Sequence, residues 1–173
     1  MNSEANHQSG ALAEYITCDR RRMARTPFPT QLTLEQLSLL PLQGLQSIRA
    51  LRGKLGRQYR ALVCDPHRGV TALMCQELSR SGTHVTALIS GGDDHHNAQS
   101  FCMLHGAKGV LTGRPAAVMN QLEDNTFDLV IDTQGGQVAY DAAKRILKDG
   151  GRYVLLNSSI VYADEQNHHH GPT

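Results

Sequence analysis

The sequence predicts an α/β protein built on a doubly wound parallel sheet with helices on both faces. An apolar run at 59–65, YRALVCD, is followed by a tight turn and by apolar residues at helical spacing over 70–83. A second apolar run at 84–89, HVTALI, completes a βαβ unit, and a third at 127–133, FDLVIDT, is apolar enough to be buried on both faces. Because crossovers between parallel strands are right-handed, we expect the strand order 3-2-1-4-5.

The remaining elements follow from local signals. Thr33 and Gln36 form a capping box for a helix at 34–40 that ends near Pro41, and a second helix is expected at 42–53. Gly150-Gly151 should stop the last helix. We also expect, in chain order, a short strand at 11–19, a loop at 20–31, a helix at 97–105, a strand at 109–111, helices at 115–123 and 137–149, and a strand at 152–156.

The core should come from strands that helices cover on both sides. Their side chains are apolar at consecutive positions, as a sheet buried on both faces requires. The residues predicted to be core are Leu62, Val63, Val85, Ala87, Leu129, Val130, Ile131, Val154 and Leu155.

Composition narrows the class of protein. The formal net charge is +1, without a broad basic field, so no nucleic-acid partner is expected. No apolar run reaches the roughly 18 residues of a membrane span, and the N-terminus lacks the apolar stretch of a secretory signal. The four cysteines are far apart in the sequence, which indicates buried thiols in an intracellular, cytoplasmic protein. Residues 1–10 are expected to be disordered and 161–173 to be a flexible tail.

Five stretches of the chain match the motifs of one known family: SGALAEYITCDRRRMARTP at 9–27, LTLEQLSLLPLQGLQSIRAL at 32–51, LHGAKGVLTG at 104–113, FDLVIDTQGG at 127–136 and LKDGGRYVLL at 147–156. Together they resemble the medium-chain dehydrogenases/reductases, most of all the quinone oxidoreductase and enoyl reductase branch. The first resembles the end of that family's GroES-like catalytic domain, the second its connecting helix pair, and the others its Rossmann nucleotide-binding domain. The order and spacing of the stretches are more specific than any one of them, and they cover most of the chain.

The first βα turn departs from the family pattern A-x-G-G-V-G. The matching residues run from Pro66 to Thr71, and only Gly69 remains of the glycines that let the backbone approach a pyrophosphate. Arg68 either crowds that path or supplies a charge-assisted phosphate contact, and Thr71 adds bulk where helix and strand should pack closely. Two alternatives follow: a working variant of the dinucleotide loop, or a Rossmann turn that no longer binds.

The resemblance places a cofactor crevice at the carboxyl ends of the strands. The second strand ends at Ser90 without the acid that grips the ribose in NAD-preferring sites, while Asp93 and Asp94 come several residues later, so the resemblance leans toward NADPH. Asp132, at the end of the fourth strand, is as compatible with a structural role, in which it satisfies loop N–H groups, as with a place near the cofactor. The predicted cofactor-binding residues are Asp65, Pro66, His67, Arg68, Gly69, Val70, Ser90, Thr133, Gly135, Gly136 and Asn157.

The resemblance implies residues 11–53 as a remnant of the GroES-like domain with its connecting helices and 54–160 as the Rossmann-like domain. No zinc is expected, because the cysteine and histidine ligand patterns of the zinc-dependent branch are missing. Most of the substrate pocket also lacks a counterpart, so catalytic residues stay unknown and a partner is expected, either a second copy or a larger protein with the missing catalytic half. The implied function is the cofactor-binding domain of a zinc-independent, NADPH-dependent oxidoreductase with weak or lost binding, not active alone. The alternative is a non-enzymatic scaffold or interaction module.

Overall fold

The computed structural model describes residues 15, 17–23, 25–26, 31–91 and 95–156. The expectations for 1–10 and 161–173 lie outside these residues. The chain forms two compact units, residues 1–37 and 38–173. Of the strand expected at 11–19, the described residues adopt no strand. In the first unit a short 3₁₀ helix, η1 (Arg20–Arg22), is capped by Asp19, whose carboxylate accepts the Arg21 N–H at 2.9 Å.

Helix α1 (Leu34–Leu51) is one continuous helix rather than the two that were predicted. The capping box is present: the Thr33 N–H donates to Gln36 Oε1 at 3.0 Å and the Gln36 N–H donates to Thr33 Oγ1 at 3.3 Å. The expected break at Pro41 is wrong, since Pro41 lies inside the helix. Proline removes one backbone hydrogen bond, but its fixed φ is helical, so the flanking apolar periodicity carries the helix through it.

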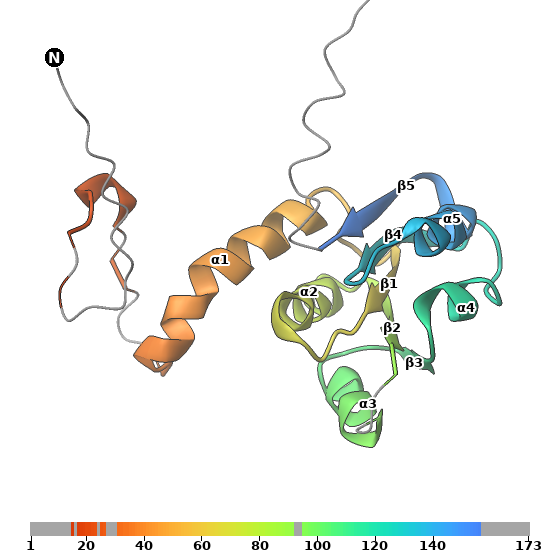
Figure 1. Ribbon diagram of the computed structural model, residues 1–173, viewed down its shortest axis with the longest axis horizontal. Coiled ribbons are helices and arrows are strands. Elements are labelled where there is room, and N and C mark those ends of the chain that lie inside the picture. The colour runs from red at the N-terminus through yellow and green to blue at the C-terminus, as the bar shows by residue number, and fades with distance from the viewer. Residues whose placement is uncertain (1–14, 16, 24, 27–30, 92–94, 157–173) are drawn as a thin grey trace, which may run out of the picture. The chain divides into compact units, whose positions relative to one another are not determined.

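The second unit holds a five-stranded, all-parallel sheet in the order β3-β2-β1-β4-β5, which confirms the predicted fold class and strand order (Figure 1). The central strand β1 pairs with β2 through Val63 and Ala87 and with β4 through Val63 and Ile131. The strands are β1 (Arg60–Cys64), β2 (His84–Ile89), β3 (Gly109–Thr112), β4 (Phe127–Asp132) and β5 (Leu147–Leu155), and the helices are α2 (Gly69–Arg80), α3 (His95–Leu104), α4 (Pro115–Met119) and α5 (Gln137–Ile146).

Helices cover both faces of the sheet. In Figure 1, α2 and α3 lie on one side of it and α4 and α5 on the other. The first face packs Val63 and Ile131 against Met74 and Leu78 of α2, and the end of α1 joins this cluster through Leu51. The second face forms its own cluster under α4 and α5. This two-sided cover explains why the central strands are apolar at consecutive positions.

The predicted core is confirmed for the central strands and wrong for β5. Val154 and Leu155 are only half-buried, because β5 is the edge of the sheet and pairs with β4 alone among the described strands. The predicted core residues with no exposed surface are Leu62, Val63, Val85, Ala87, Leu129, Val130 and Ile131.

Helix α5 ends at Ile146, three residues before the predicted end at Asp149. The next residue, Leu147, is extended at φ −74° and ψ 138° and pairs with Phe127. Beyond it β5 bulges, so that Arg152 is the residue opposite Leu129, and Gly150 takes φ +72° within the bulge. The two glycines therefore serve a bulge in the edge strand and do not stop the helix.

Arg152 fastens the end of α1 to the sheet. Its Nη1 donates to the Arg52 carbonyl at 2.8 Å, and its Nη2 donates to the Ala50 carbonyl. The Ala50 carbonyl belongs to the last turn of α1, where a cation is favourable, and Arg52 directly follows the helix. Burial lowers the pKa of the Arg152 guanidinium from its ordinary value.

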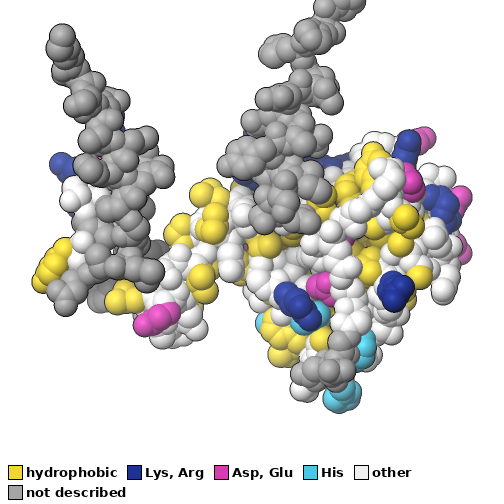
Figure 2. Space-filling view, in the orientation of Figure 1, with side chains coloured by type: hydrophobic (Ala, Val, Ile, Leu, Met, Phe, Trp, Pro, Cys, Tyr) yellow, Lys and Arg dark blue, Asp and Glu magenta, His cyan; other side chains and the backbone are white. Residues whose placement is uncertain are grey.

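Apolar side chains are exposed along α1. Leu42, Leu45 and Ile48 are each more than 60% exposed, and Figure 2 shows hydrophobic side chains gathered over this helix. An apolar groove of about 520 Å³ lies beside them, between Leu40, Gly44 and Ile48 of α1 and Leu73 of α2. Among the described residues, no helix is both long and apolar enough to cross a membrane.

Replacing a central strand residue by an acid should unfold the domain. We expect Val130→Asp to cost at least about 3 kcal/mol of unfolding free energy, because it buries a charge without a partner. The matched control is Val138→Asp, since Val138 is 68% exposed in the first turn of α5, where a negative charge is tolerated. Urea denaturation measures both. Equal stabilities of the two variants would contradict the described core.

Thiol reactivity should separate one cysteine from three. Cys18 is exposed, whereas burial raises the pKa of Cys75 and of Cys102 to about 11 and raises that of Cys64 still further. Because the thiolate is the reactive form, the folded protein should show one fast-reacting thiol with a disulfide reagent and four in guanidinium chloride. Cys18→Ser should abolish the fast phase. A second fast thiol in the folded protein would contradict the burial.

Candidate functional site

The turn between β1 and α2 is closed by its own backbone and by the side chain of Thr71. Asp65 takes φ +48°, and its carbonyl accepts the Arg68 N–H at 3.1 Å. Thr71, almost completely buried, points its hydroxyl back into the turn, with Oγ1 at 2.7 Å from the Asp65 carbonyl and 2.5 Å from the Arg68 carbonyl. Thr71 therefore stabilises the turn from inside, at the helix–strand contact where its bulk was predicted to lie, and it does not line the crevice.

The Asp65 carboxylate binds the ends of two other strands. Its Oδ1 accepts the Ser90 N–H at 2.8 Å, and its Oδ2 accepts the Ser90 hydroxyl at 2.6 Å and the Thr133 hydroxyl at 3.2 Å. Ser90 follows β2 and Thr133 follows β4, and both strands flank β1. Asp65 is only 6% exposed, so three donors satisfy a carboxylate that is almost removed from water.

A cavity of about 350 Å³ opens at this point, at the carboxyl ends of the strands. It brings together four of the predicted cofactor-binding residues, Asp65, Arg68, Ser90 and Thr133. Gln134 also lines it and donates from Nε2 to the Ser90 hydroxyl at 2.6 Å. Gly91 completes the lining.

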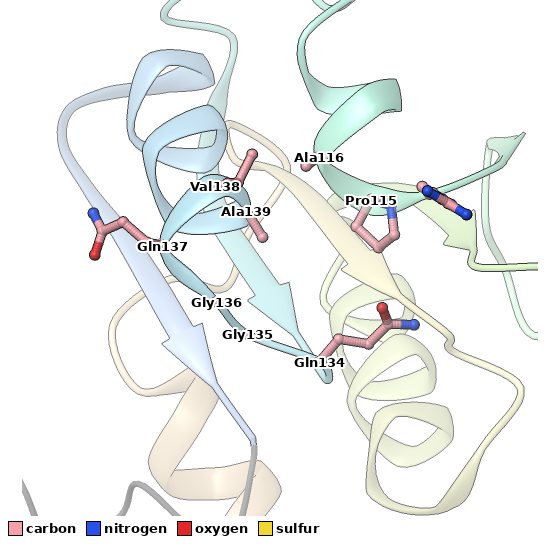
Figure 3. A pocket seen from close by; sticks show the side chains of 9 residues that line it. Pro115, Ala116, Gln134, Gly135, Gly136, Gln137, Val138 and Ala139 are labelled. Carbon is pink, nitrogen blue, oxygen red and sulfur yellow. The ribbon is translucent and has the colours of Figure 1, made fainter.

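Gly135 and Gly136, also predicted to bind cofactor, line a neighbouring cavity of about 340 Å³ at the start of α5. Figure 3 shows the side chain of Gln134 extending toward Pro115, whereas that of Gln137 points to the opposite side. Gly135 takes φ +73°, and a Cβ there would lie 3.0 Å from Leu155 Cδ1, so the turn requires glycine. Arg114 and Pro115, which follow β3, also line this cavity. The sequence analysis did not predict them, because no motif near β3 indicated a binding site.

The remaining predicted residues lie around the turn without sharing the cavity. Pro66 is buried, and His67 accepts from Arg68 Nε at 3.0 Å. Gly69 and Val70 open α2, where the N-cap residue Arg68 makes no side-chain capping bond. The first amides of α2 therefore have no capping side chain.

Three residues considered for the crevice cannot be placed. Asn157, predicted to bind cofactor, lies outside the described residues, as do Asp93 and Asp94 beyond the tip of β2. No group of three metal-ligating side chains occurs among the residues that are described.

Asp132 has a structural role, in line with one of its two interpretations. It is fully buried; its Oδ1 accepts the Gln134 N–H at 2.9 Å, and its Oδ2 accepts the Tyr153 hydroxyl at 2.6 Å. Burial and this hydrogen bond raise the pKa of Tyr153 above its ordinary value. The pair fixes the start of the loop that carries Thr133 and Gln134.

A parallel sheet in the order 3-2-1-4-5, with a crevice at its topological switch point, defines a Rossmann-type nucleotide-binding fold. Comparison with solved structures finds this fold in oxidoreductases. The CurK enoyl reductase superposes with a TM-score of 0.65 at 20% identity, covering 80% of this chain and 42% of that one. The quinone oxidoreductase of Thermus thermophilus, solved also with NADPH, gives 0.55 at 20%, covering 75% and 42%. A cobalt- and zinc-bound alcohol dehydrogenase of Pyrobaculum aerophilum gives 0.54 at 24%, covering 69% and 34%.

The Rossmann fold predicted from the sequence is thus confirmed, and in fold the chain is similar to an enoyl reductase, a quinone oxidoreductase and an alcohol dehydrogenase. It spans between 34% and 42% of the length of these solved proteins. No protein-family model matches the sequence, and no curated protein matches it.

Removing the Tyr153 hydroxyl should destabilise the loop after β4. Tyr153→Phe leaves a buried oxygen of Asp132 without its donor, which should cost about 1–3 kcal/mol in chemical denaturation. The pKa of Tyr153 is higher in the folded than in the unfolded protein. The stability that the neutral phenol contributes is therefore complete below the unfolded pKa of about 10 and is lost as the pH rises above that value. The wild type should therefore lose stability above pH 10 more steeply than Tyr153→Phe. Parallel pH profiles would contradict the pairing.

Proposed function

We propose that this chain is the cofactor-binding domain of a zinc-independent, NADPH-dependent oxidoreductase of the quinone and enoyl reductase type, and that it binds NADPH weakly. The observation that carries the proposal is the cavity at the carboxyl ends of β1, β2 and β4. In open α/β sheets this is where dinucleotides bind, with the pyrophosphate against the helix that follows the first strand. The Thermus relative solved with NADPH supports the same ligand class.

The residues present fit NADPH only in part. In favour are the uncapped start of α2 and the exposed guanidinium of Arg68, which can donate to a phosphate. Against it is the turn itself, which keeps a single glycine and holds Asp65 in the cavity. Weak binding through Arg68 follows from this balance.

Preference for NADPH over NADH rests on the tip of β2. Ser90 stands where an acid would bind the ribose hydroxyls, and its hydroxyl is already bound to Asp65 and Gln134. The Ser90 side chain is uncharged, so it does not repel a ribose 2′-phosphate as an acid at this position would. When bound, NADPH supplies the hydride, and the residues of this chain bind and orient it.

Turnover would require more than this domain. The solved reductases that share the fold are more than twice as long as the part this chain matches, and we assign no catalytic residue. We propose that the chain is not active alone. In this proposal the substrate pocket is completed by a second copy or by another protein.

A second candidate function is a non-enzymatic Rossmann scaffold. It is favoured by the Asp65 carboxylate, because three donors of the chain itself already satisfy this carboxylate at the cavity. On this alternative the sheet positions exposed surfaces such as that of α1. Both candidates share the fold and differ in whether NADPH binds.

Titration with NADPH, followed by calorimetry or nucleotide fluorescence, tests the proposal. We expect a dissociation constant on the order of 100 µM or weaker for the wild type. Arg68→Ala should weaken binding by about tenfold or more, because it removes the charged donor to phosphate. The matched control is Arg80→Ala, which removes an exposed arginine at the other end of α2 and should leave affinity unchanged.

The outcomes separate the two functions. No binding at millimolar NADPH would reject the cofactor domain in favour of the scaffold. Binding in the low micromolar range that Arg68→Ala weakens would reject the scaffold and also the proposed weakness. Equal effects of Arg68→Ala and Arg80→Ala would place the nucleotide away from the turn.

A further inference from the structure

We propose that Asp65 is the residue that sets the weak affinity: its carboxylate, held by Ser90 and Thr133, occupies from within the chain the place that a dinucleotide phosphate would take. The inference rests on the proposed function. In this inference the Asp65 carboxylate, rather than the loss of turn glycines, is the main cause of the weak NADPH affinity. Asp65 is then a determinant of which ligand the cavity accepts.

The position of the carboxylate supports this role. Asp65 is the first residue after β1, and the sheet order changes direction at β1, with β2 on one side and β4 on the other. Its bonds to Ser90 and Thr133 span both sides, so the carboxylate lies across the mouth of the switch point. It also lines the same cavity as Arg68.

Charge adds to this obstruction. A phosphate at the start of α2 would share the cavity with a carboxylate that is 6% exposed and therefore poorly screened by water. The same three donors that a phosphate oxygen could use are already bound to Asp65. A dinucleotide therefore meets a like charge and loses hydrogen-bond donors at once.

The turn glycines explain less of the weakness. Thr71, which replaces the last glycine of the pattern, is buried inside the turn and away from the cavity. Arg68 is exposed and lines the cavity as a potential donor. Only Asp65 places a negative charge in the path of the phosphate among the residues that line this cavity.

The backbone allows two clean substitutions. At φ +48°, asparagine and glycine are tolerated, whereas alanine would be strained. Asp65→Asn keeps the shape and removes the charge: its oxygen can accept the Ser90 N–H, and its amide can donate to the two hydroxyls. Asp65→Gly removes the side chain altogether.

NADPH titration of these variants tests the inference. We expect Asp65→Asn to bind at least about tenfold more tightly than the wild type and Asp65→Gly at least as tightly as Asp65→Asn. Adding Arg68→Ala to Asp65→Asn should reverse most of the gain. Circular dichroism and thermal melting establish that each variant is folded, and Asp65→Asn keeps the test valid if Asp65→Gly unfolds.

The matched control is Asp128→Asn. Asp128 is a second shielded carboxylate, 14% exposed, and it accepts the Arg60 N–H and Lys148 Nζ, both at 2.9 Å. It lies near the start of β4, at the amino ends of the strands. Its removal should leave NADPH affinity unchanged, so an equal gain in Asp128→Asn would overturn the inference as a general charge effect.

The remaining outcomes distinguish this inference from the proposed function. Wild-type binding that depends on Arg68 but is unchanged in folded Asp65→Asn would overturn the role of Asp65 and leave the cofactor domain standing. No binding by the wild type or by any folded Asp65 variant would overturn both. A wild type that already binds in the low micromolar range would overturn the exclusion by Asp65 while supporting the cofactor site.

Discussion

The carboxylate of Asp65 is the constraint on which the functional edge of this domain depends. A buried carboxylate is tolerated only when donors surround it, and here the donors come from Ser90 and Thr133, which end the two strands beside β1. The same bonds hold the residues that follow β2 and β4 beside the turn after β1. Gln134 extends the cluster through its bond to Ser90. One hydrogen-bond network around the Asp65 carboxylate thus connects the turn, the cavity and the loop after β4.

Most of the fold follows from the sequence, because consecutive apolar residues in 59–65, 84–89 and 127–133 can be satisfied only by a sheet covered on both faces. The misjudged features are those that local signals leave undecided. Proline suggested a break at Pro41, but the periodicity of α1 continues through it. The burial of β5 was overestimated because its apolar run was interpreted as fully covered, although the predicted order 3-2-1-4-5 already places this strand at the edge of the sheet.

The site was predictable in outline, because carboxyl ends of parallel strands converge, and Asp65, Arg68, Ser90 and Thr133 indeed line one cavity. What those residues do to each other was not predictable. The bond between Asp65 and Thr133 joins positions 68 residues apart, and it depends on the register between β1 and β4. An acid directly after a buried strand at a switch point is the signal that could have pointed to it.

The bonds from Arg152 to the end of α1 bear on how the chain acquires its structure during synthesis. They join groups 100 and 102 residues apart, so α1 leaves the ribosome long before its anchor exists. The exposed apolar side chains of α1, such as Leu42, Leu45 and Ile48, are present throughout that interval. Closing so long a loop is slow, and unanchored apolar helices attract one another. The C-terminal end of α1 therefore has no anchor on the sheet until the last strand has emerged.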